Sequence, residues 1–154
     1  MINMKMILIS HRGNLNGKFE SYENEPNYID NAINKGYAVE VDVWYIDEKL
    51  YLGHDKPQYG VDFKWFNDRL SMLWIHCKNI ESLLYFCDCD YDVKYFWHQE
   101  DDVTVTSNKY IWTYPGKKIT SRSIAVLPEQ VNYSEDELNM CSGICSDYIN
   151  NYKI

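Results

Sequence analysis

Four histidines each come at the end of a short apolar run, where a strand of a sheet would finish. His11 follows ILIS, His54 follows LYLG, His76 lies near the end of LWIHC, and His98 follows KYFW. In α/β folds the carboxyl ends of parallel strands gather ligand and catalytic groups. Histidine titrates near neutral pH and can both accept and release a proton. The pattern predicts a shared site with acid and base chemistry, although a lone histidine is more often structural.

Polar residues also recur in pairs two positions apart, a spacing that puts both side chains on one face of a strand. The pairs are Glu40 and Asp42, His76 and Lys78, and His98 and Glu100. The first pair alternates with valines, so two carboxylates converge inside an apolar strand. Buried carboxylates need a compensating cation. A hard divalent metal would provide it through oxygen ligands, and ion pairs with Arg12 and Lys78 are the alternative.

Eight apolar runs predict the strands that position these side chains. They cover residues 6–10, 38–44, 50–53, 72–77, 93–97, 110–114, 124–127 and 143–145. Helical patterns cover residues 26–35, 62–70 and 79–87, and Ser134 with Glu137 forms a capping box that opens a last short helix. Strand and helix alternate, and most runs are apolar throughout. We therefore expect an α/β fold with a parallel sheet.

The length limits the architecture. A chain of 154 residues fits one domain, residues 1–154. A (β/α)8 barrel typically needs about 250 residues. Eight units here would have roughly 19 residues each, whereas a strand, a helix and two loops need about 20 to 25. If the sheet is a barrel, some helices must be missing or reduced to loops. No helical pattern covers residues 101–130, so we expect the helices to be missing there.

The charge excludes two classes of partner. Fifteen Lys and Arg against 23 Asp and Glu leave a net charge of −8. Such a chain repels phosphate backbones and anionic lipid, so we expect neither nucleic-acid binding nor stable membrane association. The opening MINMKMILIS lacks the apolar length and the cleavage site of a signal peptide. No apolar run approaches the roughly eighteen residues of a membrane span. A cytoplasmic location is expected.

The five cysteines fit a reducing compartment, and their odd number excludes complete pairing within the chain. Cys87 with Cys89, and Cys141 with Cys145, could in principle hold zinc. Neither spacing is usual for a zinc site, so buried thiols are the better interpretation.

Several motifs together resemble the glycerophosphodiester phosphodiesterase family. The motifs are HRG at 11–13, ENEP at 23–26, a helix ending at Gly36, EVD at 40–42 and HD at 54–55. Farther on, WIHCK at 74–78 is similar to the ExK strand of the family, and GICSDY at 143–148 to its last strand, GxxTDxP. The likeness is dense over residues 7–55, and none extends over residues 95–135.

The resemblance implies a compact, truncated TIM-like (β/α) barrel with some helices missing or reduced to loops, and metal-dependent cleavage of a phosphodiester. It implies that His11 and His54 act as acid and base. Glu40 and Asp42 would bind Mg²⁺ or Ca²⁺. The expected substrate-binding residues, with Arg12 and Lys78 on the phosphate, are Arg12, Glu23, His76, Lys78 and His98. A hydroxyl of the substrate attacks phosphorus, giving a cyclic phosphate, and no Ser or Cys nucleophile is required.

The chain departs from the family at position 76, where His76 replaces an acidic metal ligand. The site then holds its metal more weakly, takes a metal softer than Ca²⁺, borrows Glu23 as a ligand, or no longer turns over. The large insertion that the family carries after its HD motif is also missing, which predicts a shallow groove. Residues at the ends of the later strands should rim the same mouth, with aromatic rings that could stack on a sugar or cover a polyol. They are His98, Glu100, Trp112, Tyr114 and Glu129.

Three functions remain open at this point. The first is a phosphodiester hydrolase acting on a small glycerol- or sugar-linked diester. The second is a non-catalytic protein that binds a phosphate or sugar ligand on a decayed barrel. The third, a phospholipase or sphingomyelinase-like lyase, needs an apolar rim that faces lipid, which the charge and the absence of a signal disfavour. The leaving group, the form of the product and the oligomeric state are left open.

Overall fold

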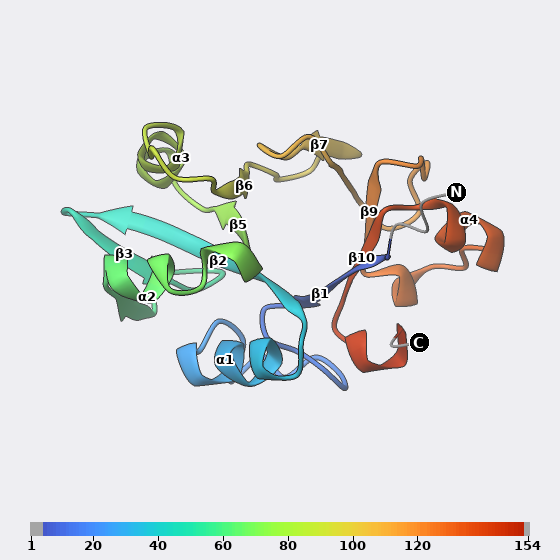
Figure 1. Ribbon diagram of the computed structural model, residues 1–154, viewed down its shortest axis with the longest axis horizontal. Helices are drawn as coiled ribbons and strands as arrows, with labels where there is room; N and C mark the ends of the chain where they lie inside the picture. The colour runs from blue at the N-terminus through green and yellow to red at the C-terminus, as the bar shows by residue number, and fades with distance from the viewer. Residues whose placement is uncertain (1–4, 153–154) are drawn as a thin grey trace.

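One mixed sheet, curved into half of a barrel, organises the part of the chain that the structure describes, residues 5–152 of a computed structural model (Figure 1). The strands are β1 (Ile7–His11), β2 (Ala38–Ile46), β3 (Lys49–Leu52), β4 (Tyr59–Val61), β5 (Leu73–Cys77), β6 (Lys94–Phe96), β7 (Val103–Val105), β8 (Ile111–Thr113), β9 (Ser123–Val126) and β10 (Gly143–Ser146). The α-helices are α1 (Pro26–Asn34), α2 (Phe63–Asn67), α3 (Ile80–Cys87) and α4 (Glu135–Met140). The described residues also form short 3-10 helices, η1 (Leu70–Met72), η2 (Pro128–Gln130) and η3 (Ile149–Tyr152).

The central strands are parallel and run in the order β6, β5, β2, β1, β10, β9 and β8. Three further strands pair antiparallel: β3 with the end of β2, β4 with β3, and β7 with β8. The register aligns His11 with Glu40 across β1 and β2, and Asp42 with His76 across β2 and β5. These pairings bring the polar residues of three strands to one edge of the sheet.

The expected TIM-like (β/α) barrel is wrong. Among the described strands β6 pairs only with β5 and β7 only with β8, so the sheet stays open between β6 and β7. Helices do not alternate with all the strands: a hairpin joins β2 to β3, and β7 runs antiparallel to β8 where a barrel would have a helix. The chain is too short to cover every crossover with a helix, and antiparallel partners use fewer residues.

The β2–β3 hairpin carries the clearest local reason for the difference. Its turn residues, Asp47 and Glu48, have φ angles of 48° and 62°. Positive φ at both turn positions matches the right-handed twist of the flanking strands and allows a tight reversal. Because β2 extends past the site and β3 returns, Gly53 N donates to Asp42 O at 3.1 Å. The hairpin therefore carries His54 back to the end of the parallel strands.

The eight predicted strands and the four predicted helices are confirmed, with modest differences in length. α1 begins with Pro26 in its first turn, and the Glu25 side chain accepts from Tyr28 N. Ser134 and Glu137 form the predicted capping box of α4. The 62–70 pattern gives only the short α2 followed by η1. The short strands β4 and β7 were not predicted, because three residues are too few for a pattern.

Two apolar clusters pack against opposite faces of the sheet. The outer one lies between the strands and the helices, and includes Ile29 of α1, Phe86 of α3 and the valines of β2. The inner one fills the concave face and consists of Ile9, Trp74, Phe96, Trp112, Ile124, Val126 and Cys145. Phe96 and Trp112 pack with ring centroids 4.5 Å apart. Their contact packs β6 against β8 on the concave face and forms an apolar floor below the polar edge.

Within residues 5–152, no helix has the length and apolar character needed to cross a membrane.

Candidate functional site

A cavity of about 270 Å³ opens at the carboxyl ends of the parallel strands. The sequence-predicted residues that line it are His11, Arg12, Glu40, His54, His76, Lys78, His98, Trp112 and Tyr114. Asp42 lies just behind them, fully buried and in contact with Arg12 and His76. Three expected residues do not line the cavity. Glu23, expected to bind substrate, packs behind Arg12. Of the expected rim residues, Glu100 is exposed and Glu129 accepts hydrogen bonds from Ser146 and Asp147 instead. The structure thus brings together all four histidines and one of the two buried carboxylates around one space.

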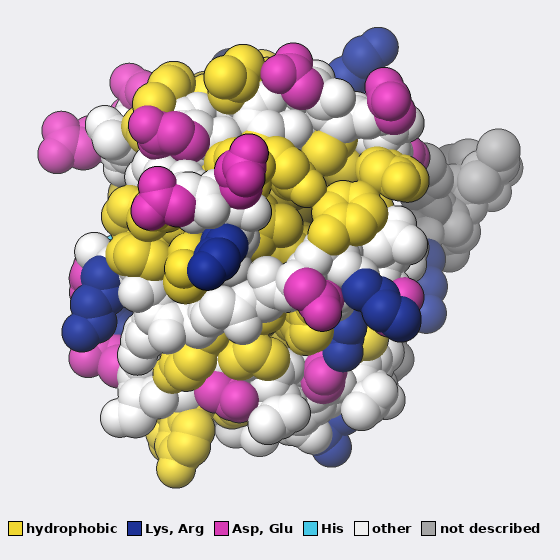
Figure 2. All heavy atoms as spheres, turned by 90° about the vertical axis from the view of Figure 1, so that its left-hand side faces the viewer, with side chains coloured by type: hydrophobic (Ala, Val, Ile, Leu, Met, Phe, Trp, Pro, Cys, Tyr) yellow, Lys and Arg dark blue, Asp and Glu magenta, His cyan; other side chains and the backbone are white. Residues whose placement is uncertain are grey.

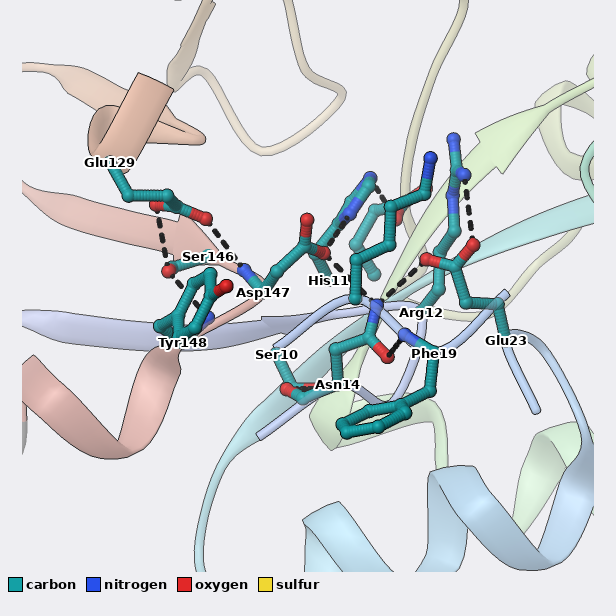
Figure 3. A network of polar contacts seen from close by, with 12 residues as sticks. Ser10, His11, Arg12, Asn14, Phe19, Glu23, Glu129, Ser146, Asp147 and Tyr148 are labelled. Carbon is teal, nitrogen blue, oxygen red and sulfur yellow. Dashed lines mark hydrogen bonds and ion pairs between the residues drawn. The ribbon is translucent and has the colours of Figure 1, made fainter. Parts of the chain in front are cut away.

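His11 and Asp147 form a short, buried polar contact at this edge (Figure 3). They follow paired positions of β1 and β10, where Ser10 aligns with Ser146, so the parallel register places them side by side. His11 Nδ1 donates to Asp147 Oδ1 at 2.7 Å. That leaves Nε2, which lies 3.6 Å from Glu40 Oε2, able to exchange a proton. A histidine oriented in this way by a carboxylate is suited to general base chemistry.

Asp147 is itself held in place. Asn14 Nδ2 donates to Asp147 Oδ1 at 3.0 Å, and the backbone N–H of Asp147 donates to Glu129 Oε1 at 3.0 Å. Burial works against ionisation of Asp147, but hydrogen bonds from His11 and Asn14 outweigh it and lower the pKa of the carboxyl. Asp147 therefore stays charged and can stabilise a protonated His11.

Asn14 also connects Asp147 to Glu23 (Figure 3). Its Nδ2 donates to Glu23 Oε2 at 2.7 Å, and its Oδ1 accepts from Tyr28 Oη at 2.9 Å. Glu23 in turn lies 3.5 Å from Arg12 Nη1. This network explains why Glu23, expected to bind substrate, instead fixes the loop behind Arg12.

Asp42 is the most deeply buried charge of the site. Arg12 Nε lies 3.0 Å from Asp42 Oδ2, and Asn24 both donates to Oδ2 and accepts from the Asp42 backbone, each at 2.9 Å. Burial would raise the pKa of Asp42, but His76, Arg12 and Asn24 outweigh it, so the pKa is lowered. Arg12 and Asn24 both have positive φ, 57° and 65°, which is uncommon outside glycine. The strained loop puts both side chains onto Asp42.

His76 stands between the carboxylates and β6. A carbonyl oxygen only accepts, so Nε2 carries the hydrogen that it donates to His98 O at 2.8 Å. Nδ1 then faces Asp42 Oδ1 at 3.1 Å and Glu40 Oε1 at 3.7 Å. Burial lowers the pKa of His76, but the two carboxylates outweigh it and raise the pKa to about 9. His76 can therefore serve as a cation here, or as a nitrogen ligand once the Nδ1 proton is lost.

The donor atoms of this group fit a divalent metal. Glu40, Asp42 and His76 each offer one ligand atom, and these atoms lie within 4.8 Å of one another. Glu40 Oε2 is buried with no hydrogen-bond partner, and Asp42 Oδ1 is buried with an ion-pair contact to His76 Nδ1 at 3.1 Å. Burying carboxylate oxygens is costly, and a cation would relieve that cost. A second cluster, His11, Glu23 and Asp147, also lies within that span, but Asn14 already bridges its two carboxylates.

The predicted alternative, ion pairs from Arg12 and Lys78 to the carboxylates, is half right. Arg12 does pair with Asp42, whereas no carboxylate of residues 5–152 lies within ion-pair distance of Lys78. Lys78 lines the cavity and remains available for an anion. His76, and not Lys78, makes the second ion pair with Asp42.

His54 reaches the cavity from the hairpin. Its Nδ1 lies 2.7 Å from Asp55 Oδ1, and its side chain is 41% exposed. Gly53 O accepts from Trp44 Nε1 at 2.7 Å, which anchors the preceding residue to β2. His54 therefore combines a fixed backbone with access to solvent.

The wall facing the histidines is largely apolar, formed by Trp112, Tyr114, Pro115, Val126 and Leu127. His98 stacks on Tyr114 with centroids 4.5 Å apart, and its Nε2–H donates to Asp101 O at 2.6 Å. One side of the cavity thus offers charge and proton donors, and the other offers surface for a carbon skeleton.

A larger hollow of about 630 Å³ lies outside the sheet between β2 and α3. Tyr45, Leu84 and Tyr85 line it together with acidic residues, and no Lys or Arg does. Figure 2 turns this side to the viewer and shows hydrophobic side chains between acidic ones. Its charge makes it unsuitable for a phosphate group.

Three residues of the site were missed by the sequence reasoning. Asp147 comes two positions after the predicted strand 143–145, close to the signal that identified the histidines, so it could have been found. Asn14 and Asn24 act through loop conformations for which one sequence carries no signal. The cysteine interpretation holds in part: Cys77, Cys141 and Cys145 are buried, but Cys87 is exposed.

No family model matches the chain, and no curated protein or solved structure matches it either. The resemblance of residues 7–55 to the phosphodiesterase family therefore stays a prediction.

Proposed function

We propose that the protein is a metal-dependent phosphodiester hydrolase that cleaves a small glycerol- or sugar-linked diester by acid and base catalysis. One observation carries the proposal: His11 and His54 line the same cavity, and each has its Nδ1 on a carboxylate, at 2.7 Å in both cases. In both rings Nε2 is left for proton transfer.

The residues divide the reaction between them. His11 Nε2 removes the proton from a substrate hydroxyl, whose oxygen attacks phosphorus, and Asp147 stabilises the imidazolium that results. The bond from phosphorus to the leaving oxygen breaks, and protonated His54 gives that oxygen a proton, which leaves a cyclic phosphate. Water then attacks this phosphate and gives a proton to His54, and protonated His11 returns its proton to the ring oxygen whose bond to phosphorus breaks. Lys78 holds a non-bridging oxygen of the phosphate. A divalent ion held by Glu40, Asp42 and His76 would add positive charge at the phosphate when bound.

The cavity volume limits the substrate. At about 270 Å³ it lies just below the usual range of small-molecule sites, roughly 300 to 1,000 Å³. A phosphodiester of two short alcohols suits this space. We place the activity in the cytoplasm, which the exposed thiol of Cys87 supports because such thiols persist in reducing compartments.

The test is a screen of small phosphodiesters by phosphorus NMR, with and without added Mg²⁺, Ca²⁺, Mn²⁺ and Zn²⁺. We expect cleavage with at least one metal. His11→Ala and His54→Ala should each lose about two to four orders of magnitude in kcat while binding a phosphate ester within a few-fold of the wild type.

The second candidate is a non-catalytic binding protein for a phosphorylated ligand. The observation in its favour is that Arg12 and His76 already compensate Asp42 without a metal. Binding of a phosphate ester with no cleavage of any diester, under all metals tried, would replace the first proposal with this one.

A further inference from the structure

We propose that His76 makes the metal site select an imidazole-preferring ion, such as Zn²⁺ or Co²⁺, over Mg²⁺ and Ca²⁺. The inference deepens the proposed function, because it concerns the metal of the same site. It can nevertheless stand or fall independently of catalysis.

The donor set is the first argument. Two carboxylates and one imidazole nitrogen lie within 4.8 Å of one another; Glu40 and Asp42 are buried and His76 is half-buried. Mg²⁺ and Ca²⁺ prefer oxygen ligands throughout and gain affinity from each added carboxylate. Imidazole favours later first-row metals, whose affinities also rise along the series toward copper. With His76 as the third ligand in place of a carboxylate, the site has less of the negative charge that binds Mg²⁺ and Ca²⁺. It gains the imidazole nitrogen that Zn²⁺ and Co²⁺ prefer.

The orientation of His76 is the second argument. The hydrogen bond from Nε2 to His98 O leaves Nδ1 as the atom that faces the carboxylates. Metal-binding histidines commonly donate their other ring hydrogen to a backbone carbonyl in this way. The ring also stacks on Phe96, with centroids 5.1 Å apart and an interplanar angle of 17°. Both contacts hold the ring in place before any ion arrives.

The distances are the third argument. Nδ1 lies 3.1 Å from Asp42 Oδ1 and 3.7 Å from Glu40 Oε1. Two ligands of one zinc ion, each bonded at about 2.1 Å, lie about 3.0 to 3.4 Å apart. Only small side-chain movements would bring the three atoms to such a distance. Glu40 Oε2 is buried without a hydrogen-bond partner, with His11 Nε2 at 3.6 Å, and the contact of Asp42 Oδ1 is to the same His76 Nδ1 that would bind the ion, so both oxygens are placed to act as ligands.

The experiment measures metal binding directly, on the full chain freed of metal, by calorimetry with Zn²⁺, Co²⁺, Mg²⁺ and Ca²⁺. We expect Zn²⁺ and Co²⁺ to bind at least about tenfold more tightly than the other two. Bound Co²⁺ should give visible bands of nitrogen and oxygen ligation without thiolate charge transfer. The background carries Cys87→Ser and Cys89→Ser, because these two thiols are not fully buried.

Two variants identify the ligand. His76→Glu should weaken Co²⁺ binding and strengthen Ca²⁺ binding, so that the ratio of the two affinities falls at least about tenfold. His54→Gln is the matched control: it removes another imidazole from the same cavity and should leave the Co²⁺ spectrum unchanged. Circular dichroism checks that each variant is folded.

Three results would overturn the inference. They are equal or tighter binding of Mg²⁺ or Ca²⁺ by the wild type, a Co²⁺ spectrum that survives His76→Glu, and no binding of any of the four ions. The last would mean that His76 is a permanent counter-ion of Asp42. If instead the selectivity is found but no diester is cleaved, the proposed function fails and this inference stands.

Discussion

His11 Nδ1 lies 2.7 Å from Asp147 Oδ1, although the two residues are 136 positions apart. His54 makes a contact of the same length with its neighbour Asp55, but in a different environment. The side chain of Asp147 is 8% exposed and that of Asp55 is 91% exposed. Water screens and competes with the second pair far more than with the first.

The two pairs should therefore respond differently to the same substitution. Asp147→Asn should lower kcat by about 10²-fold or more, because it removes the charge that stabilises protonated His11. Asp55→Asn should change kcat less than about fivefold. Steady-state kinetics on a diester found in the screen would show this, and equal losses in the two variants would contradict the roles assigned to the two pairs.

Asp147 should also contribute to acid stability. Its pKa is lowered in the folded chain, so its stabilising effect is present above the unfolded value of about 3.9 and is lost as the pH falls toward the folded value. Asp147→Asn should reduce the pH dependence of the free energy of unfolding below about pH 4, by at most about 1.4 kcal/mol per pH unit. Urea unfolding between pH 7 and pH 2.5 measures it. Parallel curves for wild type and variant would show that the carboxyl has no such effect.

Lys78 should be the principal cation for the phosphate group, since Arg12 is engaged by Asp42 and Glu23. Lys78→Met should weaken the binding of a phosphate ester by about 10- to 100-fold, the loss of one charge-assisted hydrogen bond. Lys117→Met is the control, because Lys117 lies outside the cavity in a surface ion pair with Asp102. Calorimetry compares the variants, and similar affinities for both would show that Arg12 or a metal carries the binding.

Gly53 should be needed to position His54. Its φ is 151°, and a Cβ atom there would lie 2.1 Å from Lys56 O. Gly53→Ala should destabilise the protein by about 2 to 3 kcal/mol and reduce turnover, because the backbone before His54 must shift. At Gly60 a Cβ atom would approach nothing closer than 3.7 Å, so Gly60→Ala is a matched control with little effect. Thermal unfolding and kcat distinguish the two, and a stable, active Gly53→Ala would contradict the argument.

The strands could be predicted from the sequence, but the closure of the sheet could not. Strands buried on both faces have the same apolar pattern whether their outer neighbours meet or stay apart. Closure depends on whether β6 and β7 pair along their length, and they do not, although Ser107 N, just after β7, donates to Tyr95 O of β6 at 2.9 Å. Local sequence carries no information on such a distant pairing.

The candidate site could likewise be predicted only in part. The placement of His11 and His76 could be predicted, because both lie at the ends of parallel strands. His54 reaches the expected place for a different reason, a hairpin whose turn residues, Asp47 and Glu48, are not the Asn-Gly type that signals a tight turn. The supporting Asn14 and Asn24 depend on loop conformations that tertiary contacts determine.

The position of β1 between β2 and β10 has a consequence for folding kinetics. Bringing His11 to Glu40 closes a loop of 29 residues, the difference between 40 and 11, whereas bringing it to Asp147 closes one of 136. The longer closure costs about 1 kcal/mol more in chain entropy, and contacts of such separation slow folding. The metal ligands belong to neighbouring segments of the chain, while the His11–Asp147 pair requires almost its whole length. Acid and base activity should therefore report complete folding of the chain, and metal affinity the folding of the segment from β1 to β5.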